Sequence, residues 1–109
     1  MMRSLHHMVR FEILLPLYYN NGNQIEQDKF LETNQELVTQ FGATSTDSVI
    51  VSGKWMYHGT IYDDRLIRIH MDTDDSPAHR NFLSKYKQIL KERFQQEDIW
   101  ITVQYIDII

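Results

Sequence analysis

Three side chains with acid-base or ion-pairing chemistry, Glu12, Arg68 and His70, lie in segments that the sequence predicts as neighbouring strands. A histidine beside a carboxylate and a guanidinium can act as a general base or help to bind an anion. The competing interpretation is a polar sheet face held by Arg–Glu ion pairs, which are common and add little stability. We favour this second interpretation and keep His70, Glu12 and Arg68 as the catalytic candidates.

A second group consists of aromatic side chains on segments that are predicted to meet at one end of the molecule. Tyrosine and tryptophan combine an apolar ring with a polar group, and they are enriched in interfaces and pockets. The alternative is that these rings only cap the end of the core. The predicted ligand- or partner-binding residues are Tyr18, Tyr19, Trp55, Tyr57, Tyr62 and Trp100.

The stretch from Ser48 to Asp72 predicts a long β-hairpin that carries many of these residues. A two-residue turn at His58-Gly59 fits because type I′ turns need positive φ angles, which glycine adopts freely. We expect any bulge to lie at Gly53. The turn sets a register that pairs Trp55 with Tyr62, Met56 with Ile61, Lys54 with Asp63, Val51 with Leu66, and Ile50 with Ile67.

The remaining segments complete a β-α-β-β-α-β order, with strands over 8–17 and 99–108 and helices over 25–41 and 77–95. That order is typical of a ferredoxin-like α+β fold, a four-stranded antiparallel sheet. Right-handed crossovers then place the first and third strands in the centre and both helices on one face. The apolar stripes of these elements include Val38, Ile89 and Val103 among the predicted core residues.

Composition indicates a single globular domain over residues 8–109, preceded by a mobile segment over residues 1–7. The chain has no cysteine and no apolar run long enough to span a bilayer, so we expect a cytoplasmic protein without membrane contact. The net charge of −4 argues against nucleic acid as a partner, because binding to a phosphate backbone needs a basic surface.

No motif predicts a cofactor or a metal ion. Asp72, Asp74 and Asp75 could supply oxygen ligands, but the glycine and the distal glutamate of an EF-hand loop are missing. The four glycines are too scattered for a phosphate-binding loop. The aspartates are instead expected to cap a helix and to face solvent.

The segments PLYYNNG, FGATS and ERFQQEDIWIT are similar to those of small bacterial proteins of ferredoxin-like fold. The resemblance covers nearly the whole chain and implies the fold, but it implies no activity and no functional residues.

Two functions remain open. The first is a non-catalytic, homo-oligomeric module, such as a homodimer, that binds a protein or small-molecule partner through the aromatic hairpin arm. Leu14 and Leu66 on the open sheet face favour such an assembly, since exposed apolar patches mark interfaces. The alternative is a small dimeric enzyme, similar to monooxygenases or isomerases, with a cleft on the open sheet face around His70. Fold alone does not decide between them.

Overall fold

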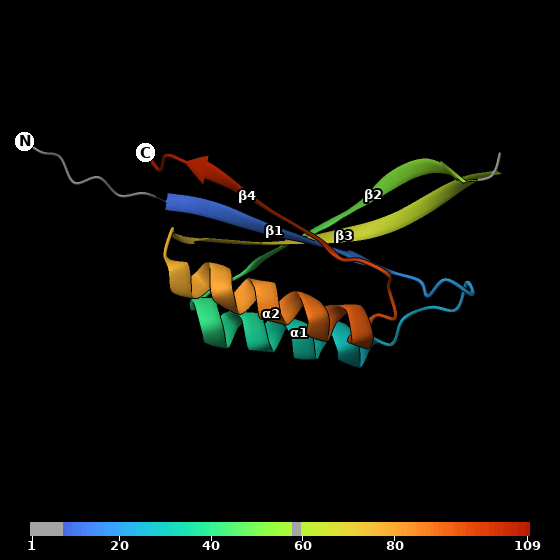
Figure 1. The fold of residues 1–109 in the computed structure, drawn as a ribbon, viewed down its shortest axis with the longest axis horizontal. Coiled ribbons are helices and arrows are strands. Elements are labelled where there is room, and N and C mark those ends of the chain that lie inside the picture. Colours follow the sequence, from blue (N-terminus) through green and yellow to red (C-terminus); the bar gives the residue numbers. More distant parts are fainter. Residues whose placement is uncertain (1–7, 58–59) are drawn as a thin grey trace, which may run out of the picture.

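The computed structural model describes the backbone of residues 8–57 and 60–109, and the side chains of residues 8–47 and 65–109. Its elements follow the predicted order (Figure 1). They are β1 (Met8–Pro16), α1 (Gln27–Phe41), β2 (Ser45–Tyr57), β3 (Thr60–Asp74), α2 (Pro77–Arg93) and β4 (Trp100–Ile106).

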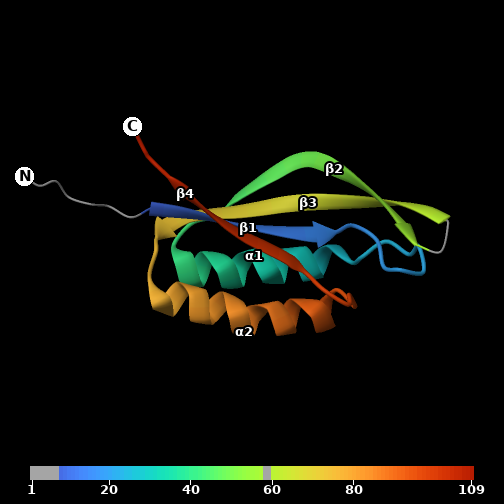
Figure 2. The ribbon, with the colours of Figure 1, turned by 45° about the horizontal axis from the view of Figure 1, so that its top comes forward.

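The four strands form one antiparallel sheet in the order β2-β3-β1-β4, so β1 and β3 are central as predicted. Both helices cover the same face of this sheet, and β2 and β3 continue beyond the ends of the helices (Figures 1 and 2). The arrangement is the ferredoxin-like α+β fold.

The core lies between the helices and the covered face of the sheet. Strand β1 alternates strictly, with Val9, Phe11, Ile13 and Leu15 buried, because successive side chains of a strand point to opposite faces. The helices contribute a second layer of buried side chains: Thr33, Leu37, Leu83, Tyr86 and Leu90.

Three residues predicted to be buried are exposed instead. Val38 is 38% exposed and Ile89 is 47% exposed, because each follows or precedes a buried leucine and is therefore turned about 100° away from it. Val103 is also 38% exposed, because β4 is an edge strand with a neighbour on one side only.

The predicted hairpin register is confirmed near its tip, where the Cα partners are Trp55 with Tyr62, Met56 with Ile61 and Lys54 with Asp63. The predicted pairing of Ile50 with Ile67 is wrong. Asp47 pairs with Arg68 and Val51 pairs with Leu66, so residues 48–50 of β2 span the interval that Ile67 alone fills in β3. The irregularity lies there rather than at Gly53, which pairs regularly with Asp64. The turn residues 58–59 lie outside the described part of the chain.

Capping residues mark the start of α2 and the end of α1. The Ser76 hydroxyl accepts a hydrogen bond from the His79 N–H at 3.2 Å, and Pro77 occupies the first position of α2. Gly42 terminates α1 with φ at 87°, and its N–H donates to the Val38 carbonyl at 2.7 Å. Local capping residues therefore help to define these helix ends.

Replacing Gly42 by alanine should lower the free energy of unfolding by about 1–2 kcal/mol, because a Cβ disfavours the left-handed conformation. A Cβ at this position would meet nothing within 4 Å, so the cost is conformational rather than steric. Urea unfolding followed by circular dichroism measures the change. Gly42→Asn is the matched control, since asparagine tolerates this region, and it should lose clearly less. Equal losses for the two variants would contradict the explanation.

Candidate ligand-binding pocket

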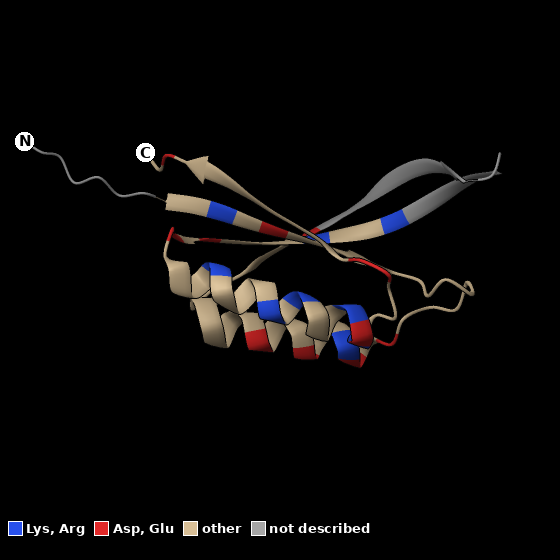
Figure 3. Ribbon diagram, in the orientation of Figure 1, with Lys and Arg blue, Asp and Glu red and all other residues tan. Residues whose placement is uncertain are grey.

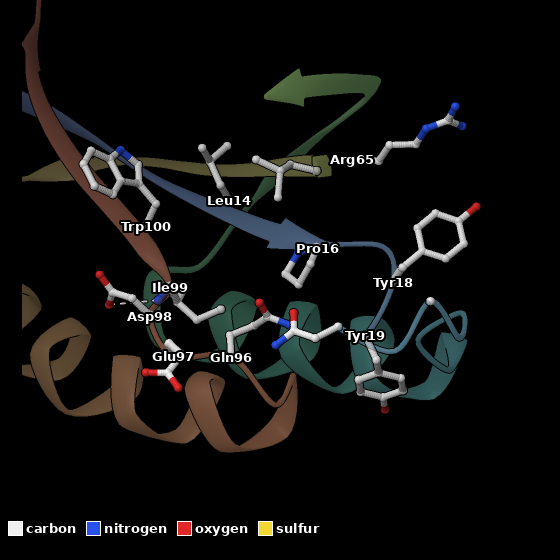
Figure 4. Close-up of a pocket in the computed structure, with 13 residues that line it drawn as sticks. Leu14, Pro16, Tyr18, Tyr19, Arg65, Gln96, Glu97, Asp98, Ile99 and Trp100 are labelled. Atoms are coloured by element: carbon white, nitrogen blue, oxygen red, sulfur yellow. Dashed lines mark hydrogen bonds between the residues drawn. The ribbon is translucent and has the colours of Figure 1, made fainter. Parts of the chain in front are cut away.

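A pocket of about 820 Å³ lies at one end of the sheet (Figure 4). Four chain segments meet there: the end of β1, the loop that follows it, the part of β3 that pairs with the end of β1, and the connection from α2 to β4. The lining residues are Leu14, Pro16, Tyr18, Tyr19, Asn20, Gly22, Arg65, Leu66, Gln96, Glu97, Asp98, Ile99 and Trp100.

The loop between β1 and α1 has a defined shape because its own backbone closes it. The Tyr19 N–H donates to the Asn23 carbonyl at 2.8 Å, and the Gly22 N–H donates to the Tyr19 carbonyl at 2.9 Å. The Ile25 N–H donates to the Leu17 carbonyl at 2.9 Å, which joins the two ends of the loop. Gly22 adopts φ of 90°, a conformation that favours glycine. The loop therefore presents its side chains from a fixed backbone.

Tyr19 ties this loop to both helices. Its hydroxyl donates to the Glu26 carboxylate and accepts from Lys29 Nζ, which also donates to the Arg93 carbonyl at 2.9 Å. The bond to Tyr19 is the main reason that the pKa of Glu26 lies below its usual value and that of Lys29 above. Hydrogen bonds through Lys29 therefore connect Tyr19, which lines the pocket, to the last residue of α2.

Two aromatic rings of the pocket are available to a ligand. Trp100 is 64% exposed and Tyr18 is 40% exposed, although both are large rings with apolar surface. The indole lies beside Leu14, its Cα partner across the β1–β4 pair, with Pro16 further along β1 (Figure 4). Exposed rings above an apolar floor can stack against a planar group.

The polar groups of the pocket divide into a cationic and an anionic side. The Arg65 side chain lies on the same side as Tyr18, opposite Trp100 (Figure 4). Glu97 and Asp98 come from the connection to β4. Asp98 accepts from Lys87 Nζ at 3.0 Å, and this contact is the main cause that holds its pKa below the usual value. The pocket therefore offers both a guanidinium donor and carboxylate acceptors.

The structure brings three of the predicted binding residues, Tyr18, Tyr19 and Trp100, to one pocket. The others, Trp55, Tyr57 and Tyr62, lie outside the residues whose side chains are described. The lining residues that sequence reasoning missed include four with charged or amide side chains: Arg65, Gln96, Glu97 and Asp98. Strand polarity was sufficient to find the last three, because residues directly before β4 must lie at the same end as Trp100.

The catalytic candidates do not line the pocket, but they lie next to it on the open face of the sheet, where Arg68 is the Cα partner of Leu14. The Arg68 guanidinium contacts Asp47 at 2.7 Å and Glu12 at 3.5 Å. Glu12 and His70 are Cα partners on β1 and β3, so the predicted trio does lie together. His70 is not among the residues that line the pocket, and the enzyme hypothesis around it stays a prediction.

A second ion pair continues this polar face. Arg10 donates two hydrogen bonds to the carboxylate of Asp72, at 2.7 and 2.9 Å, from the adjacent strand. These bonds are the main reason that the pKa of Asp72 lies below its usual value. On the helices, basic and acidic residues are interspersed (Figure 3). The ion pairs between strands agree with the interpretation of the open face as a polar surface held by ion pairs.

Among the side chains that the structure describes, those of residues 8–47 and 65–109, no group of three or more His, Cys, Asp or Glu is placed to hold a metal ion. Neither helix of the described chain is long and apolar enough to cross a bilayer.

Comparison by sequence finds no relatives: no protein-family model matches the chain, and no curated protein is significantly similar. Comparison by structure finds clear similarity of fold. A phage SAM lyase in complex with S-methyl-5'-thioadenosine has a TM-score of 0.69 at 15% identity, covering 96% of this chain and 86% of the lyase. CutA from Synechococcus elongatus has a TM-score of 0.59 at 9% identity, covering 95% of this chain and 80% of CutA.

The GlnK–ATP complex of B. subtilis also shares the fold, with a TM-score of 0.59 at 15% identity over 95% of this chain and 85% of GlnK. At these identities the likeness establishes the fold alone. It agrees with the ferredoxin-like arrangement of four strands and two helices described above.

Proposed function

We propose that this protein is a small-molecule-binding module whose pocket takes an adenosine-type nucleoside or nucleotide. The observation that carries the proposal is the pocket itself, which combines two exposed aromatic rings, Trp100 and Tyr18, with polar groups of both charges. The proposal concerns binding and assigns no reaction.

The dimensions of the pocket suit a ligand of this size. Sites for small molecules and cofactors have volumes of about 300–1,000 Å³ and are mostly apolar with a few placed polar groups. The volume here is about 820 Å³, and the floor is formed by Leu14, Pro16 and Leu66. A nucleobase has a flat π-surface that can stack on the indole of Trp100 or the phenol ring of Tyr18.

The charged groups fit the rest of a nucleotide. The guanidinium of Arg65 matches the geometry of a phosphate, to which it can donate two parallel hydrogen bonds. The Glu97 carboxylate accepts hydrogen bonds, as the hydroxyls of a ribose require. Asp98 is already held by Lys87, so Glu97 is the acceptor that we assign to the sugar.

Two of the similar structures support the choice of adenosine over other nucleosides. The phage lyase was solved with S-methyl-5'-thioadenosine and the GlnK protein with ATP, and both ligands contain adenosine. We further propose that the protein works as a homo-oligomer, which the exposed apolar side chains of Val103 and Tyr105 on the edge strand β4 support. Leu14 and Leu66, which suggested such an assembly from the sequence, line the pocket instead. The partner-binding role predicted for the hairpin arm stays a proposal.

Isothermal titration of the full chain with ATP and with S-methyl-5'-thioadenosine tests the proposal. We expect saturable binding of at least one of the two ligands, and Arg65→Gln should weaken ATP binding at least tenfold. That change corresponds to about 1.4 kcal/mol, within the range for a hydrogen bond to a charged group. S-methyl-5'-thioadenosine has no phosphate, so its binding should change much less.

Arg80→Gln is the matched control, since Arg80 is an exposed arginine on α2 that pairs with Asp75 away from the pocket. It should bind both ligands as the parent does. No heat of binding for either ligand at millimolar concentration would overturn the proposed function. Equal weakening by the two arginine variants would remove Arg65 from the site.

A further inference from the structure

Strand β4 forms one edge of the sheet and carries exposed apolar side chains along its length. Trp100 is 64% exposed, Val103 is 38% exposed and Tyr105 is 72% exposed. The strand has the sequence WITVQYI, which contains neither a charged residue nor a proline. Its described neighbour is β1 alone, so its outer edge offers unpaired backbone groups.

Such an edge is unusual for a chain that stays monomeric. Proteins protect exposed edges with lysine, proline, bulges or very short strands, because an open edge pairs readily with another strand. The other edge, β2, has an irregularity of this kind between Asp47 and Val51. Strand β4 pairs regularly with β1 from Trp100 to Ile106 and has no such protection.

The sequence of β4 is complementary to itself in the antiparallel direction. With Val103 of two copies facing each other, Trp100 lies opposite Ile106, Ile101 opposite Tyr105, and Thr102 opposite Gln104. On the face of Val103 all pairs are then apolar or aromatic, and on the face of Trp100 an apolar pair is followed by the polar pair of Thr102 and Gln104. Matched cross-strand pairs of this kind stabilise a sheet. A two-fold interface requires this kind of self-complementarity.

We infer that β4 pairs antiparallel with β4 of a second copy, so that two sheets join across this edge. The consequence for the pocket rests on the proposed function. Trp100 belongs both to the edge and to the pocket, so pairing brings Ile106 of the second copy beside the indole. The chain that follows, which includes the exposed Ile108, then runs past Ile99 and Asp98 at the rim. The second copy closes one side of a pocket that one copy leaves open.

Light scattering coupled to size exclusion tests the pairing in the full chain. The parent should elute at twice the 13.1 kDa mass of one chain, and Val103→Lys should elute at 13.1 kDa, because two lysines would face each other on the axis. Val38→Lys is the matched control, since Val38 is equally exposed but lies on α1. A parent of 13.1 kDa, or equal masses for parent and Val103→Lys, would overturn the inference.

A thiol test serves where Val103→Lys fails to fold. The chain has no cysteine, so Val103→Cys carries a single thiol. Directly opposed residues of an antiparallel pair have Cα atoms about 4.5–5.5 Å apart, a distance that a disulfide spans. Val103→Cys should form a linked dimer under mild oxidation much faster than Val38→Cys. Equal rates of cross-linking for the two cysteine variants would overturn the inference. So would light scattering that shows an assembly with a different protein, or with more copies joined by another surface.

Ligand titration separates this inference from the proposed function. Weakened binding of S-methyl-5'-thioadenosine by Val103→Lys, but not by Val38→Lys, supports closure of the pocket by the second copy. Unchanged binding by the monomeric variant would overturn the closure and leave the proposed function intact. Intact assembly with no binding by the parent would overturn only the proposed function.

Discussion

Replacing Phe94 by alanine is expected to lower the free energy of unfolding by about 3–5 kcal/mol, the cost of a buried phenylalanine and its cavity. Phe94 is fully buried directly after α2, and the centroid of its ring lies 5.2 Å from that of Phe30 on α1. A domain of this size is stable by about 5–15 kcal/mol, so the variant should lose a large part of its stability.

Chemical unfolding in urea measures this change, and Ile89→Ala is the matched control on α2. Ile89 is almost half exposed, so its truncation should cost less than about 1 kcal/mol. Comparable losses in the two variants would show that the end of α2 packs differently from the arrangement described above.

The second large effect is expected at Arg93, which joins the two helices. Its side chain is only 12% exposed and donates to Thr33 Oγ1 at 2.8 Å and to the Glu36 carboxylate at 2.7 Å. The Tyr86 hydroxyl also donates to Glu36, at 2.8 Å. Arg93→Met keeps the aliphatic part of the side chain but removes these donors, and we expect a loss of about 1.5–3 kcal/mol.

Arg80→Met is the control for Arg93→Met, because the Arg80–Asp75 pair lies at the surface. Exposed pairs contribute about 0–1 kcal/mol, so this variant should unfold near the parental midpoint. Unfolding in urea at neutral pH decides between the two outcomes. If Arg93→Met were as stable as Arg80→Met, the network between the helices would contribute nothing.

The same network predicts a dependence on pH. The hydrogen bond from Arg93 is the main cause that lowers the pKa of Glu36 in the folded protein. The stabilisation from this carboxylate is therefore complete above its unfolded pKa, about 4.3, and is lost as the pH falls through the lower folded value. The parent should lose stability more steeply than Arg93→Met between pH 5 and pH 3. Parallel pH profiles would contradict this assignment.

The elements of the fold could be predicted because their signals are local. The strand over 8–17 was predictable because Val9, Phe11, Ile13 and Leu15 recur at every second position. The helix that starts at 77 was predictable because Ser76 and Pro77 are typical of a helix start. The irregularity in β2 could not be predicted, because Val49 and Ile50 are β-branched and apolar in the manner of a regular strand. Its position depends on how both ends of the hairpin pair.

The candidate site was predictable only in part. Strand polarity predicted that Tyr18, Tyr19 and Trp100 lie at one end of the sheet, and all three line the pocket there, while their role in binding stays a prediction. Arg65 was missed because nothing in its neighbourhood distinguishes it from other charged hairpin residues. The exposure of Val103 was also missed, since period-two alternation gives the face of a residue but not whether its strand lies at an edge.

The central position of β1 has a consequence for biosynthesis. Strand β1 is synthesised before both of its partners, β3 and β4, and Phe11 lies opposite both Met71 and Val103. Contacts this distant in sequence form slowly. One side of β1 therefore stays unpaired until the segment from Trp100 to Ile106 has been synthesised, and the pocket, which draws residues from both β1 and β4, is completed only then. A nascent or truncated chain that lacks this segment would leave one backbone edge of β1 unpaired, and such open edges make partly folded chains prone to aggregation.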